Sequence, residues 1–98
     1  MARRKVLRPG EEITIRFTLQ ERDLILDHTL AGPDLTDRLQ LAIMERGQIT
    51  AKYSLEDLDE LLGYIAAEAN HSEDERRATR LYKLYDRLSD IEASVVED

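Results

Sequence analysis

The segment ITIRFTLQERDLILDH, residues 13–28, aligns without a gap with ITAKYSLEDLDELLGY, residues 49–64. Each copy opens with an apolar residue at every second position, which is the pattern of a strand that buries one face. Thr18 or Ser54 follows, with an acidic residue three positions later, the spacing of a helix capping box. Behind the cap the apolar residues recur at helical intervals. The repeated unit is therefore predicted to be a strand, a cap and an amphipathic helix, and every matched position has a structural explanation.

Residues 33–46, between the two copies, fit two structures. As a helix, the stretch has proline at its first position, acidic residues in its first turn and a glycine after its end. As a strand, its later leucine and isoleucine residues alternate, and ERGQ at 45–48 has the composition of a hairpin turn. We expect a short helical turn at 33–38 and then a strand at 39–44 that pairs antiparallel with 49–54. A single helix is the alternative.

The chain after the second copy indicates two helices joined by a turn. Asn70 tolerates the left-handed conformation that ends a helix, and Ser72 with Glu75 repeats the capping-box spacing. The last helix is predicted from residue 73 to about 92, with leucine and tyrosine residues at helical intervals. The whole pattern predicts an α+β fold: a small, mainly antiparallel sheet of about three strands, packed against three helices, with a C-terminal helical hairpin.

Charge is unevenly distributed along the chain. The first ten residues contain four basic side chains and no acidic one: Arg3, Arg4, Lys5 and Arg8. The other 88 residues hold 10 basic and 21 acidic side chains, so this body would repel phosphate groups, and nucleic acid is disfavoured as a partner. We predict a basic flexible arm at 1–10, a single domain at 11–92 and a frayed C-terminus at 93–98.

Composition excludes several classes of site and location. The chain has no cysteine, which excludes disulfides and thiolate zinc sites. No apolar run approaches the ~20 residues that span a bilayer, and the arginine pair near the start lacks the apolar stretch that follows it in an export signal. A cytoplasmic protein that binds no membrane is therefore expected.

Two histidines are the candidates for chemistry. Glu68 precedes His71 by three residues, the spacing found in di-iron bundles, but such sites need a second motif and His28 has isoleucine at that place. His28 follows Asp27, and an aspartate–histidine pair is suited to act as a general base. Neither a nucleophile nor a phosphate-binding loop accompanies the pair, however. We therefore expect no enzyme, no catalytic or metal-binding residue and no cofactor. A small metal-dependent or histidine-based enzyme is the alternative.

The broad apolar face of the last helix indicates a protein contact. Leu81 lies at the centre of that face, and Tyr82 and Tyr85 widen it beyond what one core contact requires; aromatic side chains inside a charged rim are common in interfaces. These three residues are the predicted interface, through which the chain would self-associate or bind another protein. Gly63 lies inside the helix of the second copy and is expected to allow the close approach of another backbone, that of the last helix in preference to that of a second chain.

The function expected from these observations is a non-enzymatic protein-interaction or regulatory module with an unidentified partner. A weaker alternative is a nucleic-acid-associated regulator that uses the basic arm and a stripe of cations on the last helix. The stripe consists of Arg76, Arg80, Lys83 and Arg87. We expect this stripe to be a solvated face that balances the acidic helix before it.

Overall fold

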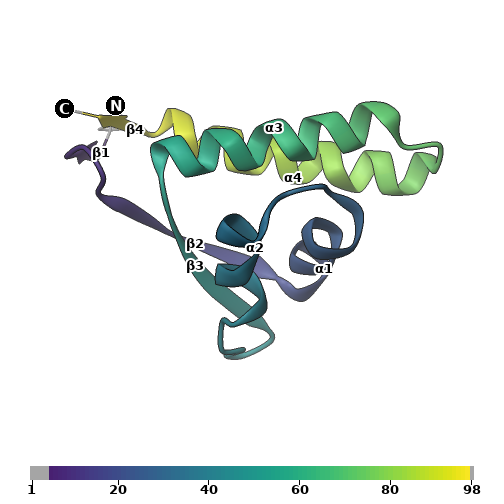
Figure 1. Cartoon of the computed structure of the whole chain (residues 1–98), viewed down its shortest axis with the longest axis horizontal. Helices are drawn as coiled ribbons and strands as arrows, with labels where there is room; N and C mark the ends of the chain where they lie inside the picture. Colours follow the sequence, from purple (N-terminus) through teal and green to yellow (C-terminus); the bar gives the residue numbers. More distant parts are fainter. Residues whose placement is uncertain (1–4, 98) are drawn as a thin grey trace.

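The computed structural model of the chain describes residues 5–97 and is an α+β fold. Its elements in chain order are β1 (Lys5–Leu7), β2 (Glu12–Thr18), α1 (Leu19–His28), α2 (Pro33–Gln40), β3 (Gln48–Ser54), α3 (Leu55–His71), α4 (Glu75–Ala93) and β4 (Val95–Glu97). Figure 1 shows α3 and α4 side by side in one layer, with α1, α2 and the ribbon of β2 and β3 beneath them. None of the helices within residues 5–97 is both long and apolar enough to cross a membrane.

The ribbon of β2 and β3 is antiparallel, and its register follows the sequence repeat. Odd-numbered residues of both strands are buried in the core, while the even-numbered residues lie at the surface. Ile15 lies opposite Ala51, its own equivalent in the second copy, and the pairs on either side mirror one another. A local two-fold axis therefore passes through the Ile15–Ala51 pair and relates the two copies.

Both predicted caps of the repeat are present. The Thr18 hydroxyl accepts a hydrogen bond from the Glu21 N–H at 3.1 Å, and the Glu21 carboxylate accepts one from the Thr18 N–H at 2.9 Å. In the second copy the Ser54 hydroxyl accepts from the Asp57 N–H at 3.1 Å. The local switch from strand to helix is therefore the same in the two copies, and it fixes where α1 and α3 begin.

The predicted start of the last helix is wrong by two residues. Asp74, not Ser72, is the cap of α4, because its carboxylate accepts from the Arg77 N–H at 3.0 Å and an ionised oxygen is the stronger acceptor. This bond holds the pKa of Asp74 below its usual value. Ser72 instead donates its hydroxyl to the Asp74 carbonyl at 3.2 Å.

The predicted strand at 39–44 does not form, so β3 pairs with β2 and each of the two sheets has two strands instead of about three. Leu35 and Leu39 are both fully buried at the four-residue spacing of a helix, and α2 therefore runs to Gln40. The helices within residues 5–97 thus number four rather than three. The predicted turn at 45–48 is present, with positive φ at both central residues as in the type I′ hairpin turn.

The two ends of the described chain pair with each other. β1 and β4 form a short parallel ladder of three residue pairs, and Leu7 and Val95 are buried against one end of the core. Figure 1 shows β1 and β4 next to each other at this end. This pairing differs from the flexible arm predicted at 1–10 and the frayed end predicted at 93–98, because an apolar residue on each strand gains burial. Residues 1–4 and 98 lie outside the described residues.

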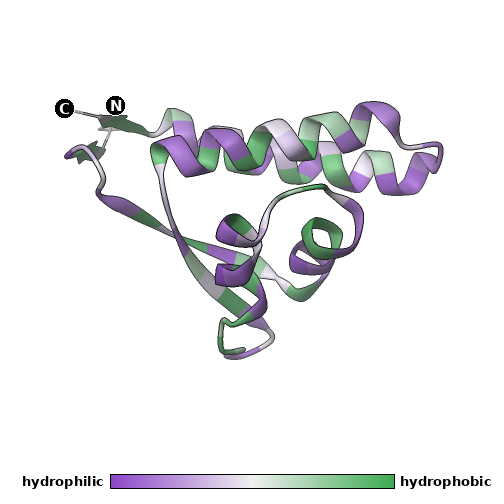
Figure 2. Cartoon of the chain, viewed as in Figure 1, coloured by the Kyte–Doolittle hydropathy of each residue, from purple (hydrophilic) through white to green (hydrophobic). Residues whose placement is uncertain are grey.

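One apolar cluster holds the layers together. The cluster contains residues from all four strands and all four helices of the described chain. Among the described residues, every buried side chain is hydrophobic. Figure 2 shows hydrophobic residues on both layers, and a further hydrophobic stretch in the loop that hangs below α2 and β3. Three of the exposed large hydrophobic residues, Leu41, Ile43 and Met44, lie in that loop.

In each copy of the repeat, an arginine from a helix distant in sequence hydrogen-bonds both the strand and the helix cap. Arg87 of α4 donates two hydrogen bonds to the Glu21 carboxylate, at 2.8 and 2.9 Å, and one to the Arg16 carbonyl at 2.9 Å. Its guanidinium carbon also lies 5.7 Å from the centre of the Phe17 ring. One side chain thus joins α4 to the strand, the cap and the core aromatic residue of the first copy.

Arg38 of α2 makes the equivalent contacts in the second copy. It donates to the Asp57 carboxylate and to the Lys52 carbonyl, both at 2.9 Å, and lies 5.0 Å from the centre of the Tyr53 ring. The bond from Arg38 holds the pKa of Asp57 below its usual value, while burial raises the pKa of the Tyr53 phenol, which donates to the Leu35 carbonyl at 2.6 Å. The two copies therefore have matching arginine clamps.

The two clamps show how the copies are interlocked. Each copy is a strand followed by two helices, and the arginine on its second helix contacts the other copy. α3 is seven residues longer than α1, 17 against 10. Arg87 is the thirteenth residue of α4 and Arg38 the sixth of α2, which is the same difference of seven residues, or about two helical turns. In the second pair, the seven extra residues of α4 that precede its arginine therefore lie at the end where α3 and α4 are joined.

Replacing either clamp arginine by methionine should lower the free energy of unfolding by about 1–3 kcal/mol, because charged hydrogen bonds are lost while the apolar stem is kept. Urea denaturation of Arg38→Met and Arg87→Met measures the effect, and the two losses should be similar.

The contribution of the Arg38 clamp should depend on pH. Because the folded protein holds the pKa of Asp57 below its ordinary value of 3.8, the ionised carboxylate stabilises the fold fully at a pH above 3.8, and this stabilisation is lost as the pH falls through the folded pKa. The deficit of Arg38→Met should therefore shrink in acid. Arg80→Met, at an exposed position of α4, is the control, and an equal loss there would contradict the clamp.

Gly63 does not have the predicted role. It is exposed on α3, and a Cβ added there would meet no atom within 4 Å, so no helix approaches it closely.

Gly63→Ala should therefore raise the free energy of unfolding by about 0.5–1 kcal/mol, since alanine restricts the unfolded chain and favours the helix. Urea denaturation measures the gain. Gly47→Ala is the matched control and should destabilise, because Gly47 has a φ of +78°. A loss of stability in Gly63→Ala would instead support a close backbone contact at position 63.

Candidate interaction surface

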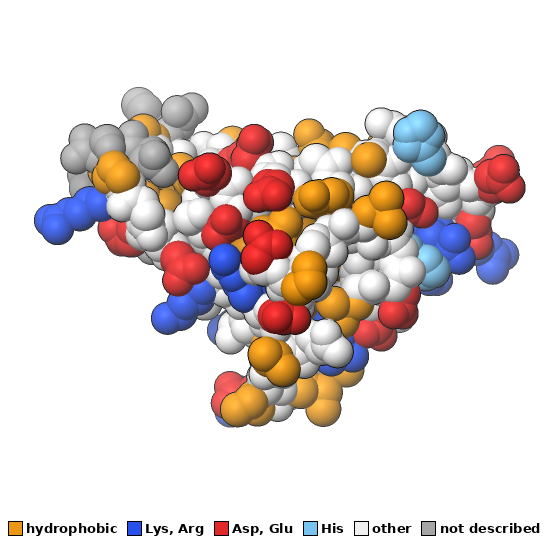
Figure 3. Space-filling view, in the orientation of Figure 1, with side chains coloured by type: hydrophobic (Ala, Val, Ile, Leu, Met, Phe, Trp, Pro, Cys, Tyr) orange, Lys and Arg blue, Asp and Glu red, His pale blue; other side chains and the backbone are white. Residues whose placement is uncertain are grey.

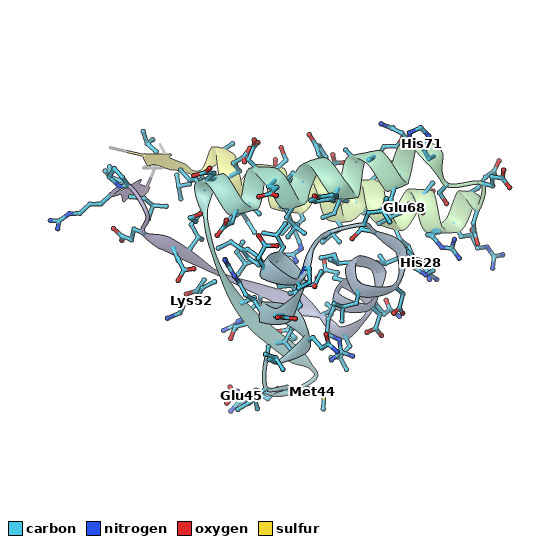
Figure 4. The ribbon with its side chains drawn as sticks, in the orientation of Figure 1. His28, Met44, Glu45, Lys52, Glu68 and His71 are labelled. Carbon is cyan, nitrogen blue, oxygen red and sulfur yellow. The ribbon has the colours of Figure 1, made fainter. Side chains whose placement is uncertain are left out.

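The two histidines predicted as candidate catalytic or metal-binding residues lie at the ends of two different helices. His28 ends α1 and is half-buried, while His71 ends α3 and is exposed. Figure 4 shows Glu68 and His71 at the far end of the helical layer, with His71 directed away from the body. Within residues 5–97 no group of three or more histidine, aspartate or glutamate side chains is placed to hold a metal ion.

The predicted interface on α4 is only partly at the surface. Leu81 is fully buried, because it shares with Leu84 and Leu88 the stripe of α4 that packs on the core, and it is therefore wrong as an interface residue. Tyr85 is half-buried against the same core. Tyr82 is 46% exposed, and its hydroxyl donates to the Asn70 side-chain carbonyl. The set thus reduces to a single exposed ring.

A different apolar surface lies between α2 and β3. Leu41, Ile43 and Met44 are 78%, 82% and 56% exposed, and together with Ala42 they form a segment that we call the apolar arm, residues 41–44. In Figure 3 orange side chains gather at the lower tip of the molecule, where Figure 4 places Met44 and Glu45. The arm is exposed because α2 ends just before it and the turn at 45–48 leads the chain straight back into β3.

Two hollows separate the apolar arm from β3. The larger has a volume of about 810 Å³, with Ile43 and the turn on one side and Arg16 and Thr50 on the other. The smaller, of about 530 Å³, lies between the arm and the stretch from Thr50 to Lys52. Thr50 is common to both hollows. The two therefore form one groove along the outer edge of β3, which we call the β3-edge groove.

The backbone of β3 has one open position in this groove. Gln48 exchanges two hydrogen bonds with Glu45, at 2.7 and 3.0 Å, on the side of β3 away from β2. Because strand residues alternate in direction, Thr50 and Lys52 also present their backbone groups to that side. The Lys52 carbonyl is occupied by Arg38. For Thr50, no hydrogen bond outside the ladder with β2 is found among residues 5–97.

Basic and acidic residues both line the groove, on a molecule whose net charge is −7. Arg16, Arg46 and Lys52 are all exposed beside it, and within the described part of the chain none has an ion-pair partner within 4.0 Å. The acidic residues are Glu12, Asp37 and Glu45. The groove therefore combines an apolar wall, an open backbone position and three cations available for a partner.

Sequence analysis missed this surface. The leucine and isoleucine residues of the arm fit the strand predicted at 39–44, and Arg16 and Lys52 fit the polar side of the strand predicted in each copy. The usable signal was that Arg16 and Lys52 occupy equivalent positions of the repeat and both are basic. The surface has to be interpreted from its own geometry, since no protein-family model, no curated protein and no solved structure matches this chain.

Proposed function

We propose that the protein is a non-enzymatic protein-interaction module that binds its partner through the apolar arm and the β3-edge groove. The observation that carries this proposal is the exposure of Leu41, Ile43 and Met44 side by side in one short segment. Full burial of such a side chain contributes about 1.5–3 kcal/mol, so a partner that covers the arm has a substantial driving force. Clustered exposed apolar residues next to polar ones are typical of binding sites.

The contact on α4 is a weaker basis for the same function. Of the predicted residues Leu81, Tyr82 and Tyr85, Tyr82 alone is well exposed, and its hydroxyl already has a partner in Asn70. Self-association through α4 would thus depend on one ring. We place the interface on the arm instead.

A hydrolytic or metal-dependent activity has less support. The two hollows are lined by arginine, lysine, threonine, glutamine and acidic side chains together with apolar ones, and His28 and His71 belong to neither. A threonine hydroxyl needs a base hydrogen-bonded to it to become a nucleophile, and no hydrogen bond from the Thr50 hydroxyl to a carboxylate or histidine is found among residues 5–97. The groove is therefore better suited to binding than to catalysis.

Photo-crosslinking tests the proposed interface. A benzophenone amino acid at position 43 should crosslink a partner in extracts of the source cells, because Ile43 lies at the centre of the arm. Leu30, which is 89% exposed on the turn before α2, is the matched control position and should give no such product. Leu41→Ser together with Met44→Ser should abolish the product while leaving the thermal unfolding temperature unchanged. Equal products at positions 30 and 43 would overturn the proposed interface.

A second candidate function, a nucleic-acid-associated regulator, is favoured by the exposed face of the ribbon. Arg16 lies opposite Thr50 and Lys52 opposite Thr14, and the two-fold axis exchanges these pairs. The major groove of DNA admits a two-stranded ribbon, and a two-fold arrangement of donors suits a palindromic duplex. This route differs from the basic arm, of which residues 1–4 lie outside the described residues. It also differs from the helix stripe, where Arg87 is held in a clamp.

Charge limits this second candidate. A net charge of −7 repels phosphates, and the ribbon face offers few cations to offset it. Any binding should therefore be weak and should fall steeply with salt. Fluorescence anisotropy with a mixed-sequence duplex at low salt tests it: Arg16→Ala with Lys52→Ala should abolish binding, while Leu41→Ser with Met44→Ser should not. No binding by the unmodified chain would exclude this candidate and leave the protein-interaction proposal intact.

A further inference from the structure

Among residues 5–97, Thr50 is the position on the outer edge of β3 at which neither backbone group has a hydrogen-bond partner outside the ladder. On one side of Thr50 the turn occupies both backbone groups of Gln48, and on the other side Arg38 occupies the Lys52 carbonyl. An unpaired strand edge is a template for another extended chain, and natural proteins usually cover or charge such an edge. Here the groove leaves room beside the edge instead, along the whole stretch from Gln48 to Lys52.

We propose that an extended segment of a partner protein adds to β3 as a further strand, with its backbone paired to Thr50 and with both acidic and apolar side chains. This inference rests on the proposed function and names the partner's binding mode. Strand addition is a general way to bind a peptide, in which the main chain provides affinity and alternate side chains provide specificity. The closed positions at Gln48 and Lys52 would fix the register, because only Thr50 can exchange both hydrogen bonds.

The side chains around the edge determine what the segment carries. Successive residues of a strand point to opposite faces. Those on the face shared with Arg16 and Lys52 would meet cations that have no ion-pair partner among residues 5–97, so carboxylates fit there. Ile43 lines the same hollow as Arg16, and Leu41 lines the same hollow as Lys52, so aliphatic side chains of the segment fit beside its carboxylates. The segment is therefore expected to carry both acidic and apolar side chains.

The local two-fold axis supplies a control position. Thr14 is the equivalent of Thr50 on β2, and it has the same direction relative to the ribbon. Neither hollow includes Thr14, and no apolar arm flanks it. A segment that needs only an open backbone would use both edges, whereas one that needs the groove would use β3 alone.

The experiment is an NMR titration of the full chain with a short blocked peptide of alternating valine and glutamate. The Thr50 amide should exchange with solvent at least about tenfold more slowly in the complex, since it gains a hydrogen bond, while the Thr14 amide should not change. A peptide with lysine in place of glutamate should not bind. A peptide N-methylated at its glutamate residues should lose the protection on the unmodified chain, because the residue that exchanges both bonds with Thr50 has its side chain on the face shared with Arg16 and Lys52.

Proline variants test the same bond from the protein side. Thr50→Pro removes the outward N–H without touching the ladder to β2 and should weaken peptide binding at least about tenfold, whereas Thr14→Pro should bind normally. Circular dichroism checks that both remain folded. Three results would overturn strand addition: equal binding by Thr50→Pro, undiminished binding of the N-methylated peptide, or a Thr50 amide already protected in the free chain. The last would mean that the arm itself covers the edge.

The outcomes separate this inference from the proposed function. If position 43 crosslinks a partner and Thr50→Pro crosslinks it equally well, the interaction module stands and strand addition fails. If the peptide protects Thr50 but position 43 crosslinks nothing, the edge is a peptide site and the proposed interface on the arm fails.

Discussion

Phe17→Ala and Tyr53→Ala should each lower the free energy of unfolding by about 3–5 kcal/mol, enough to leave a domain of this size close to unfolded. The two residues are equivalent in the repeat and are 1% and 0% exposed. Their rings meet edge to face, with centres 6.4 Å apart and an angle of 76° between their planes. Each ring also lies under a clamp arginine, so a truncation removes core packing and clamp contacts together.

Urea denaturation followed by circular dichroism measures these losses, and a double-mutant cycle measures the coupling. Removing both rings should cost less than the sum of the single losses, because each single variant already breaks the ring–ring contact. Tyr82→Ala is the control at an exposed ring and should cost far less. Additive losses would mean that the two copies are stabilised independently, which contradicts the interlocked packing.

Leu7→Ala should lower the free energy of unfolding by about 2–4 kcal/mol, because Leu7 is 1% exposed and its loss leaves a cavity where β1 meets β4. A flexible arm would tolerate the same change with no effect. Val6→Ala is the control on the same strand, since Val6 is 63% exposed. Thermal unfolding of the two variants distinguishes the cases, and equal midpoints would mean that the pairing of the ends contributes nothing to stability.

Those elements whose causes are local could be predicted from the sequence. The caps at Thr18 and Ser54 use side chains three residues from the groups they bind, and the alternation in each copy defines β2 and β3 without reference to the rest of the chain. The turn at 45–48 is equally local. The α+β class followed from these elements.

Elements that depend on distant contacts could not be predicted. Leucine and isoleucine at 39–43 fit a strand and a helix equally well, and burial of Leu35 and Leu39 decided between them. β1 pairs with β4 across nearly the whole chain, so neither short segment carries a signal of its own. Arg38 and Arg87 looked like surface charges because their acceptors lie 19 and 66 residues away.

The candidate surface was hidden for the opposite reason. The sequence marks Leu41 and Ile43 as apolar, and the normal expectation for such residues is burial. Their exposure arises because the chain turns back at 45–48 before it can pair with more of β3. An open position such as Thr50 is defined by bonds that other residues do not make, and no sequence pattern describes it.

The interlocked copies have a consequence for stoichiometry. Two separate half-chains related by a two-fold axis would be identical, and each would present its binding edge, so the assembly would hold two ligands. Here the halves are covalently joined, and they differ: α3 is seven residues longer than α1, and the groove accompanies Thr50 but not Thr14. The scaffold is nearly symmetric while its recognition is one-sided. Each molecule should therefore engage one partner segment, and a titration should saturate at a single equivalent.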